Sequence, residues 1–184
     1  MRQHLKLHPN SYSLAARQVE VDITHPRPGR LLLSYILKGE LYGILMPSIT
    51  APARADNLWH HTCFEAFVRA SVGTVYYEFN FAPSTEWAAY SFTSYRSGMS
   101  VATEASGPII KTRSSHNRYI LQANLDLDRL SALPRLAGWR LGLAAMIEDA
   151  DGRMSYWALA HPPGMPDFHR ADCFVHELSA AVVS

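Results

Sequence analysis

Two carboxylates lie inside strand-like segments that are otherwise aromatic and apolar. Glu65 stands in CFEAFV and Glu78 stands in YYEFNF. Successive side chains of a strand point to opposite faces, so Glu65 shares a face with Arg69, and Glu78 shares one with Tyr76 and Asn80. Carboxylates accept hydrogen bonds from hydroxyl groups, and aromatic rings stack on apolar ring faces. The pattern therefore predicts a binding face for a neutral, polyhydroxylated ligand.

The same residues allow two other interpretations. The face could be a solvated outer sheet face, on which Glu and Arg side chains pair across strands. Alternatively, Glu65 and Glu78 could be the acid pair of a glycosidase, since two carboxyl groups at a suitable separation suffice. The sequence contains no GxSxG motif, no glycine-rich phosphate loop and no defensible Ser/His/Asp order. The residues alone leave these interpretations open.

Alternation with a period of two predicts the strands that must hold these residues. It occurs three times between residues 58 and 96, with turns at Gly73 and at Pro83-Ser84. Further strands are expected at residues 3–8 (as an edge strand), 17–24, 31–37, 41–46, 107–113, 119–125, 139–147, 154–159 and 173–178. Only residues 127–133 read as a helix, which Pro134 would end. About ten strands and little helix favour an all-β antiparallel β-sandwich.

The composition is that of one globular domain covering residues 1–184. Hydrophobic residues make up 48% of the chain and charged residues 18%, and the net charge is +1, which favours neither nucleic acid nor membranes as partners. No apolar run suits a signal peptide or a membrane span, so a cytoplasmic location is expected. Cys63 and Cys173 fit buried thiols, although a disulfide between them stays open. The oligomeric state is not predicted.

Several motifs together resemble a known superfamily. They are Trp59, Glu65 within TCFEAFV, the runs YYEFNFAPS and WAAY, and a closing segment with Trp157, HPP and FHRADCF. The chain is similar to the DOMON-like superfamily, in particular to its branch that resembles family 9 carbohydrate-binding modules. The resemblance covers most of the chain, from the strand at Leu31 to the end. It implies a DOMON-like β-sandwich, immunoglobulin- or jelly-roll-like in type.

The resemblance also implies a set of ligand-binding residues. In family 9 modules, two tryptophans sandwich a sugar at a chain end, while acids and amides bind its hydroxyls. The corresponding set in this sequence is Trp59, Glu65, Tyr76, Glu78, Asn80 and Trp157. The alternative is that either tryptophan is simply a core residue. We expect a non-catalytic module that binds a saccharide or a sugar-derived small molecule.

Cofactors follow from the resemblance only as alternatives. Other DOMON relatives bind haem b through Met and His, so a haem-binding electron-transfer module is the second candidate function, with Met146 as a possible ligand. Calcium could bind at the turn formed by Asp149, Asp151 and Gly152, which also reads as an ordinary hairpin turn. The histidines and cysteines match no closed zinc pattern. We expect no resident cofactor or metal, and we expect His169 to anchor the loop before the last strand.

Overall fold

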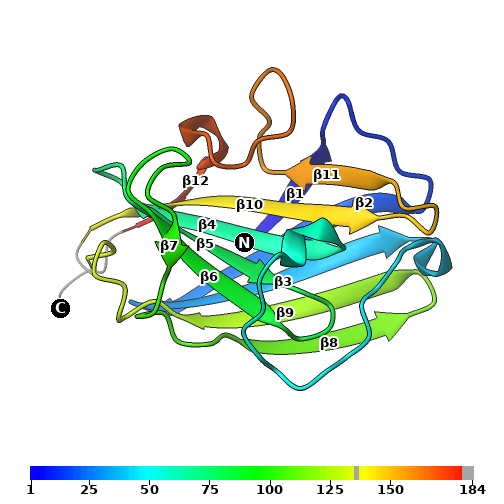
Figure 1. The fold of residues 1–184 in the computed structure, drawn as a ribbon, viewed down its shortest axis with the longest axis horizontal. Coiled ribbons are helices and arrows are strands. Elements are labelled where there is room, and N and C mark those ends of the chain that lie inside the picture. Colours follow the sequence, from blue (N-terminus) through cyan, green and yellow to red (C-terminus); the bar gives the residue numbers. More distant parts are fainter. Residues whose placement is uncertain (135–136, 180–184) are drawn as a thin grey trace.

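The computed structural model describes residues 1–134 and 137–179, and these are almost entirely β-strand and loop (Figure 1). The strands are β1 (Arg2–Leu7), β2 (Ala16–Arg27), β3 (Arg30–Gly39), β4 (Cys63–Ala70), β5 (Tyr76–Phe81), β6 (Trp87–Phe92), β7 (Ser100–Val101), β8 (Ile109–Ser115), β9 (Arg118–Asp126), β10 (Trp139–Glu148), β11 (Met154–Ala158) and β12 (His176–Leu178). Three 3₁₀ turns are η1 (Leu41–Gly43), η2 (Leu58–His60) and η3 (Ala171–Cys173). The all-β expectation is confirmed.

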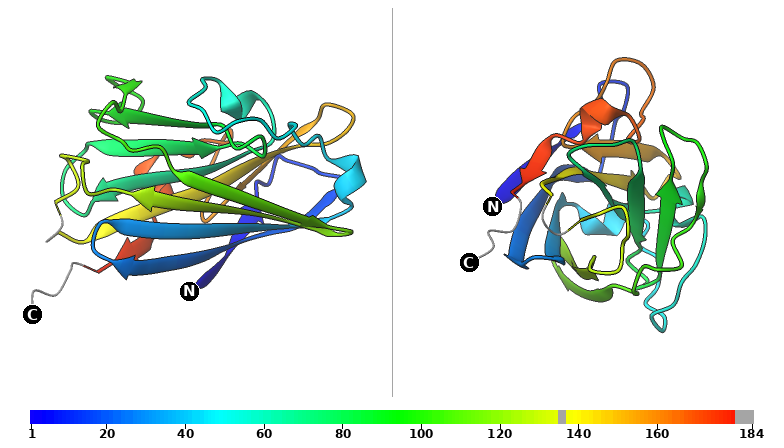
Figure 2. Two further views of the ribbon diagram at one scale, coloured as in Figure 1. Left: turned by 90° about the horizontal axis from the view of Figure 1, so that it is seen from below. Right: turned by 90° about the vertical axis from the view of Figure 1, so that its left-hand side faces the viewer.

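The strands form one antiparallel sheet that curls into a sandwich-like shape. Its order is β7-β6-β5-β4-β10-β11-β1-β2-β3-β9-β8, and β12 pairs with β10. A sheet can bury an apolar face only by packing it against a second layer. Curling provides that layer, because it brings the two halves of the sheet together. The right-hand view of Figure 2, along the strands, shows the sheet curling around the interior.

Alternation divides the apolar side chains between two cores. The inner core joins the two halves of the sheet and includes Phe64 of β4 and Phe79 of β5. The outer face of β4 and β5 is also buried. Phe67 on that face contacts the rings of Phe168 and Phe174, which come from the segment after β11 (orange to red in Figure 1). The alternative of a solvated outer face is therefore wrong for this part of the sheet.

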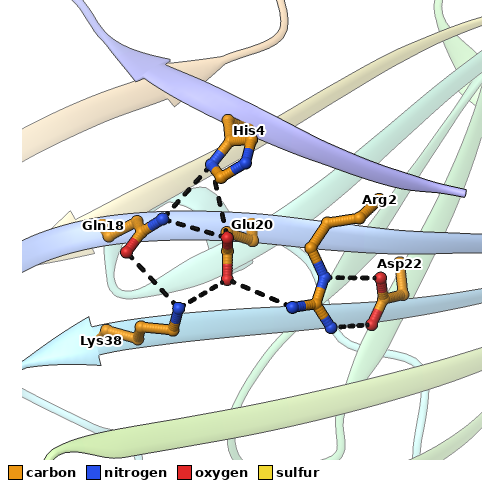
Figure 3. A network of polar contacts seen from close by, with 6 residues as sticks. All are labelled: Arg2, His4, Gln18, Glu20, Asp22 and Lys38. Atoms are coloured by element: carbon orange, nitrogen blue, oxygen red, sulfur yellow. Dashed lines mark hydrogen bonds and ion pairs between the residues drawn. The ribbon is translucent and has the colours of Figure 1, made fainter.

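The first strand is not an edge strand, contrary to the sequence-based expectation. β1 pairs with β2 through residues 2–5 and with β11 through residues 6–7, so it joins the two halves of the sheet. On the outer face of the sheet, a polar network connects β1 to β2 and β3 (Figure 3). The buried carboxylate of Glu20 on β2 lies 2.8 Å from Nζ of Lys38 on β3 and 3.4 Å from Nδ1 of His4 on β1, and Arg2 on β1 binds Asp22 through two hydrogen bonds.

Two local expectations are also wrong. Residues 127–133 form turns and not a helix. Leu127, Leu130 and Leu133 are buried in the inner core, and their spacing of three imitates a helical period. Residues 41–46 form η1 and then a single β-bridge, from Ile44 to Asp149, where a strand was expected.

Two further findings concern membrane-spanning helices and disulfide bonds. Among residues 1–134 and 137–179, no helix is long and apolar enough to span a membrane. Cys63 and Cys173 are both buried and both free, so the disulfide that the sequence left open is not formed.

Candidate ligand-binding pocket

A pocket of about 320 Å³ lies on the outer face of the sheet, which puts it at the lower end of the usual size range of ligand sites. Strands contribute Glu65, Glu78, Phe92, Met146 and Tyr156. Loops and η2 contribute Trp59, Arg96, Met99, Pro166, Phe168 and His169. Sheet pairing explains the strand set, since Met146 is paired with both Cys63 and Tyr156, and Glu65 lies opposite Asn80.

Glu65 forms the acidic floor of the pocket on β4. Its side chain is buried, with 3% of the residue exposed, and its main-chain carbonyl accepts a hydrogen bond from Tyr35 in the opposite layer. Within the described residues, no hydrogen-bond donor reaches its carboxyl group. Burial raises the pKa of Glu65 well above its usual range, and the nearby Glu78 adds to this, while Arg96 opposes it. Burial without a hydrogen-bond partner therefore favours the neutral form of this carboxyl.

Glu78 is the second carboxyl, and Asn80 holds it in place. Nδ2 of Asn80 donates a 2.8 Å hydrogen bond to Oε1 of Glu78. Burial raises the pKa of Glu78, although the Asn80 hydrogen bond and Arg96 act in the opposite direction. Asn80 is fully buried beneath Glu78 and does not line the pocket. Its position fits a residue that orients Glu78.

Tyr76 lies behind the pocket wall and connects it to a loop. Its hydroxyl accepts a hydrogen bond from the main chain of Arg96 at 3.3 Å and bonds Nδ1 of His169 at 2.8 Å. Burial lowers the pKa of His169 to about 4, and the charge of Arg96 contributes, so the ring is neutral near pH 7. Burial also raises the pKa of Tyr76 to about 12. His169 does anchor its loop by hydrogen bonds, and it also lines the pocket.

Trp59 provides a half-buried aromatic wall at the rim. It lies in η2, which begins directly after Asn57. Asn57 has a left-handed backbone conformation with a φ of 61°. The edge of its indole meets the ring of Tyr90 with centroids 5.9 Å apart. The Tyr90 hydroxyl in turn donates a hydrogen bond to Asp56. This support fixes the ring while leaving part of it accessible.

Trp157 does not lie in the pocket. Its ring belongs to the inner core, with 5% of the residue exposed, and its Nε1 donates a 3.1 Å hydrogen bond to Oγ of Ser155. Its neighbour Tyr156 points the other way and lines the pocket. The pocket therefore contains Trp59, Glu65 and Glu78 of the expected set, Tyr76 and Asn80 support it from behind, and Trp157 lies apart.

Sequence reasoning missed several pocket residues. Tyr156 could have been found, because alternation along β11 places it opposite Trp157. Arg96 and Phe168 lie in loops without periodicity, so only the folded chain brings them to the strand face. Arg96 is fixed there by Asp167, whose carboxylate lies 3.0 Å from its guanidinium.

Comparison with solved structures identifies the fold. A protein from Bacteroides uniformis ATCC 8492, solved as a candidate carbohydrate-binding protein, superposes with a TM-score of 0.70 at 14% identity, over 98% of this chain and 86% of that one. The chain shares the fold of this protein. A family 9 carbohydrate-binding module from Caldicellulosiruptor kristjanssonii in complex with cellotriose gives a TM-score of 0.58 at 9% identity, covering 100% and 84% of the two chains.

A second structure, of a family 9 module from the same organism in complex with glucose, gives a TM-score of 0.53 at 10% identity, over 95% of this chain and 81% of that one. The sequence matches no protein-family model and no curated protein. The wider DOMON-like assignment therefore stays a prediction, while the likeness to carbohydrate-binding modules is a likeness of fold.

The residues present fit haem poorly. Met146 and His169, which would be its axial ligands, do line the same pocket. However, two buried carboxyl groups line it as well, and they would lie beside a macrocycle that carries two propionates of its own.

The turn at Asp149 is also poorly suited to calcium. The carboxylate of Asp149 already accepts hydrogen bonds of 2.8 Å from Ser13 and from the main chain of Leu14.

Proposed function

We propose that the protein is a non-catalytic module that binds a saccharide in this pocket. One observation carries the proposal: the carboxyl groups of Glu65 and Glu78 open into a pocket whose rim is an indole, that of Trp59. A pyranose has apolar C–H faces that stack on an aromatic ring and hydroxyls that need directional partners. The fold of the carbohydrate-binding neighbours agrees with this role.

Each pocket residue has a role in the proposal. Trp59 stacks on one face of the sugar, and Tyr156 provides the second ring that was expected from Trp157. Glu65 offers unused hydrogen-bonding capacity, because no protein group bonds its carboxyl within the described residues. Glu78, oriented by Asn80, offers the oxygen that Asn80 leaves free. Because the pocket is small, we expect one or two sugar rings to fill it.

A glycosidase is less well supported by the same residues. Hydrolysis by a carboxyl pair needs one group ionised, as nucleophile or base, while the other is protonated. Burial raises the pKa of both Glu65 and Glu78. Arg96, the cation nearest to them in the pocket, is engaged by Asp167. This environment favours hydrogen bonding to hydroxyls over acid–base chemistry.

The test is a titration with glucose and cellotriose, followed by tryptophan fluorescence and by melting temperature. The wild type should show a saturable change and a higher melting temperature with ligand. Trp59→Ala should weaken binding about tenfold, because stacking on one ring contributes on the order of 1 kcal/mol or more. Trp59→Phe is the matched control, since it keeps an aromatic face and should keep most of the affinity.

A different pair of results would contradict saccharide binding at Trp59. If Trp59 serves only packing, Trp59→Ala should lower the melting temperature strongly, and no saccharide should change the fluorescence of the wild type. That pair of results would overturn the proposal.

A further inference from the structure

The pocket contains more acid than base. The acidic and basic groups that face it or support its wall are Glu65, Glu78, Asp167 and Arg96. Tyr156 and His169 also line the pocket, and Cys63 and Tyr76 lie behind its wall. Arg96 is bound to Asp167 by contacts of 3.0 and 3.3 Å, so these two charges balance one another. Two carboxyl groups are left without a cation from the protein.

His169 does not supply the missing charge. Its Nε2 lies 3.8 Å from Oε2 of Glu78, but burial and the charge of Arg96 lower the pKa of the ring to about 4. The ring is held between aromatic side chains, with the ring centroid of Phe92 5.1 Å away. A protonated imidazole is disfavoured there, and the carboxyl group of Glu65 has no hydrogen-bond partner among the described residues.

We propose, on the basis of the saccharide-binding role above, that the pocket selects a sugar that carries a primary ammonium group, held against Glu65 and Glu78. An ammonium group has three hydrogen-bond donors and one positive charge, which the two carboxyl groups can accept and balance. A neutral hydroxyl can satisfy the hydrogen bonds but not the charge. The indole of Trp59 at the rim also favours a cation, through its negative ring face.

Binding of an ammonium group should release a proton from the pocket. The free protein holds a neutral carboxyl, because burial without a cation disfavours the ionised form. When an ammonium group binds, the carboxylic acid becomes a carboxylate paired with the ammonium, and its proton leaves to the solvent. The complex thus holds fewer protons than the free protein and ligand together. Affinity for the amino sugar should therefore rise with pH between about 5 and 7.

The experiment is isothermal titration of the wild-type protein with glucosamine, N-acetylglucosamine and glucose at about pH 6, where an α-amino group is protonated. The three sugars share a ring, and only glucosamine carries a charge. Glucosamine should bind about tenfold or more tightly than the other two. Its measured heat should depend on the ionisation enthalpy of the buffer, which reports the released proton.

A variant adds a second test. Glu65→Gln keeps the size of the side chain but cannot ionise, so the ratio of the glucosamine affinity to the glucose affinity should fall toward one. Glu40→Gln, at an exposed carboxylate bonded to Tyr42 outside the pocket, replaces a carboxyl group by the same amide and should keep the preference. Loss of the preference in both variants would overturn the proposal.

The outcomes separate the two proposals. Equal affinity for glucosamine, N-acetylglucosamine and glucose, with no proton release, would overturn the ammonium-sugar inference and leave the saccharide-binding role intact. Absence of binding by all three sugars would overturn the inference together with the proposed function. Tighter binding of glucosamine with proton release, in the wild type alone, supports the inference even where Glu65→Gln fails to fold.

Discussion

Tyr156 and Trp157 are neighbours in β11, yet Tyr156 lines the pocket and Trp157 is buried in the inner core. The period of two in a strand requires this, because successive side chains point to opposite faces. Only one residue of such a pair can meet a ligand. The position of β11 in the sheet decides which one does so.

The first prediction concerns this pair. Trp157→Ala should lower the free energy of unfolding by about 3–5 kcal/mol, because it empties a fully packed site. Tyr156→Ala should cost distinctly less stability, since Tyr156 is only half-buried, and should weaken saccharide binding about threefold to tenfold. Urea unfolding and a saccharide titration measure the two effects. Tyr156→Phe, which keeps the ring, is the control, and a stable Trp157→Ala variant with lost binding would contradict the assignment.

The second prediction concerns Glu65 and pH. A carboxyl whose pKa is raised in the folded state contributes stability below its unfolded pKa, near 4.5, and that stability is lost as pH rises through the folded pKa. Glu65→Gln does not titrate, so its stability relative to wild type should improve as pH rises from about 4.5 to about 7. Denaturant unfolding at several pH values measures this. A difference that stays flat would show that Glu65 is not held neutral by burial.

The control for this experiment is Glu40→Gln. Hydrogen bonds from Tyr42 and Arg17 lower the pKa of Glu40, so its removal should bring no gain in relative stability as pH rises.

The third prediction concerns His169. Its pKa falls from 6.5 to about 4 on folding, so the unfolded chain binds the proton first, and wild-type stability should fall as pH drops between these values. His169→Gln should remove part of this dependence. His116→Gln, at an exposed histidine in the turn between β8 and β9, should leave it unchanged. The measurement is melting temperature against pH, and equal slopes for wild type and His169→Gln would rule out this role.

The fourth prediction concerns the network on Glu20 in Figure 3. Glu20 is buried and is bonded or ion-paired to groups on β1, β2 and β3. Glu20→Ala should lower the free energy of unfolding by about 1.5–3 kcal/mol, the range for hydrogen bonds to a charged group. Asp22→Ala, which removes a more exposed partner of Arg2, should cost less. Equal losses in the two variants would show that burial of Glu20 adds nothing.

The fifth prediction tests the haem alternative. Protein purified after growth with added haem should be colourless, because the pocket offers two buried carboxyl groups where a macrocycle would lie. An absorbance spectrum gives the answer. A Soret band that disappears on Met146→Ala or His169→Ala would favour the haem-binding role instead.

Local patterns in the sequence predicted most of the strands and which face their side chains take. Alternation in β4 and β5 placed Glu65, Tyr76 and Glu78 on one face, because the direction of a strand side chain depends only on its position in the strand. The same logic failed at residues 127–133, where three leucines spaced by three pack from turns into the core. Periodicity reports burial, and burial does not require a helix.

The tertiary structure decided what covers that face. Trp59 comes from η2, Arg96 from the loop after β6, and Phe168 and His169 from the segment after β11. The sequences of these three segments carry no period that could show where they meet. Their meeting over β4 and β5 turns a polar sheet face into a buried pocket, and this burial is what raises the pKa values of Glu65 and Glu78. Desolvation depends on everything that surrounds a group in space, so a linear pattern could name the two carboxyls but could not predict their state.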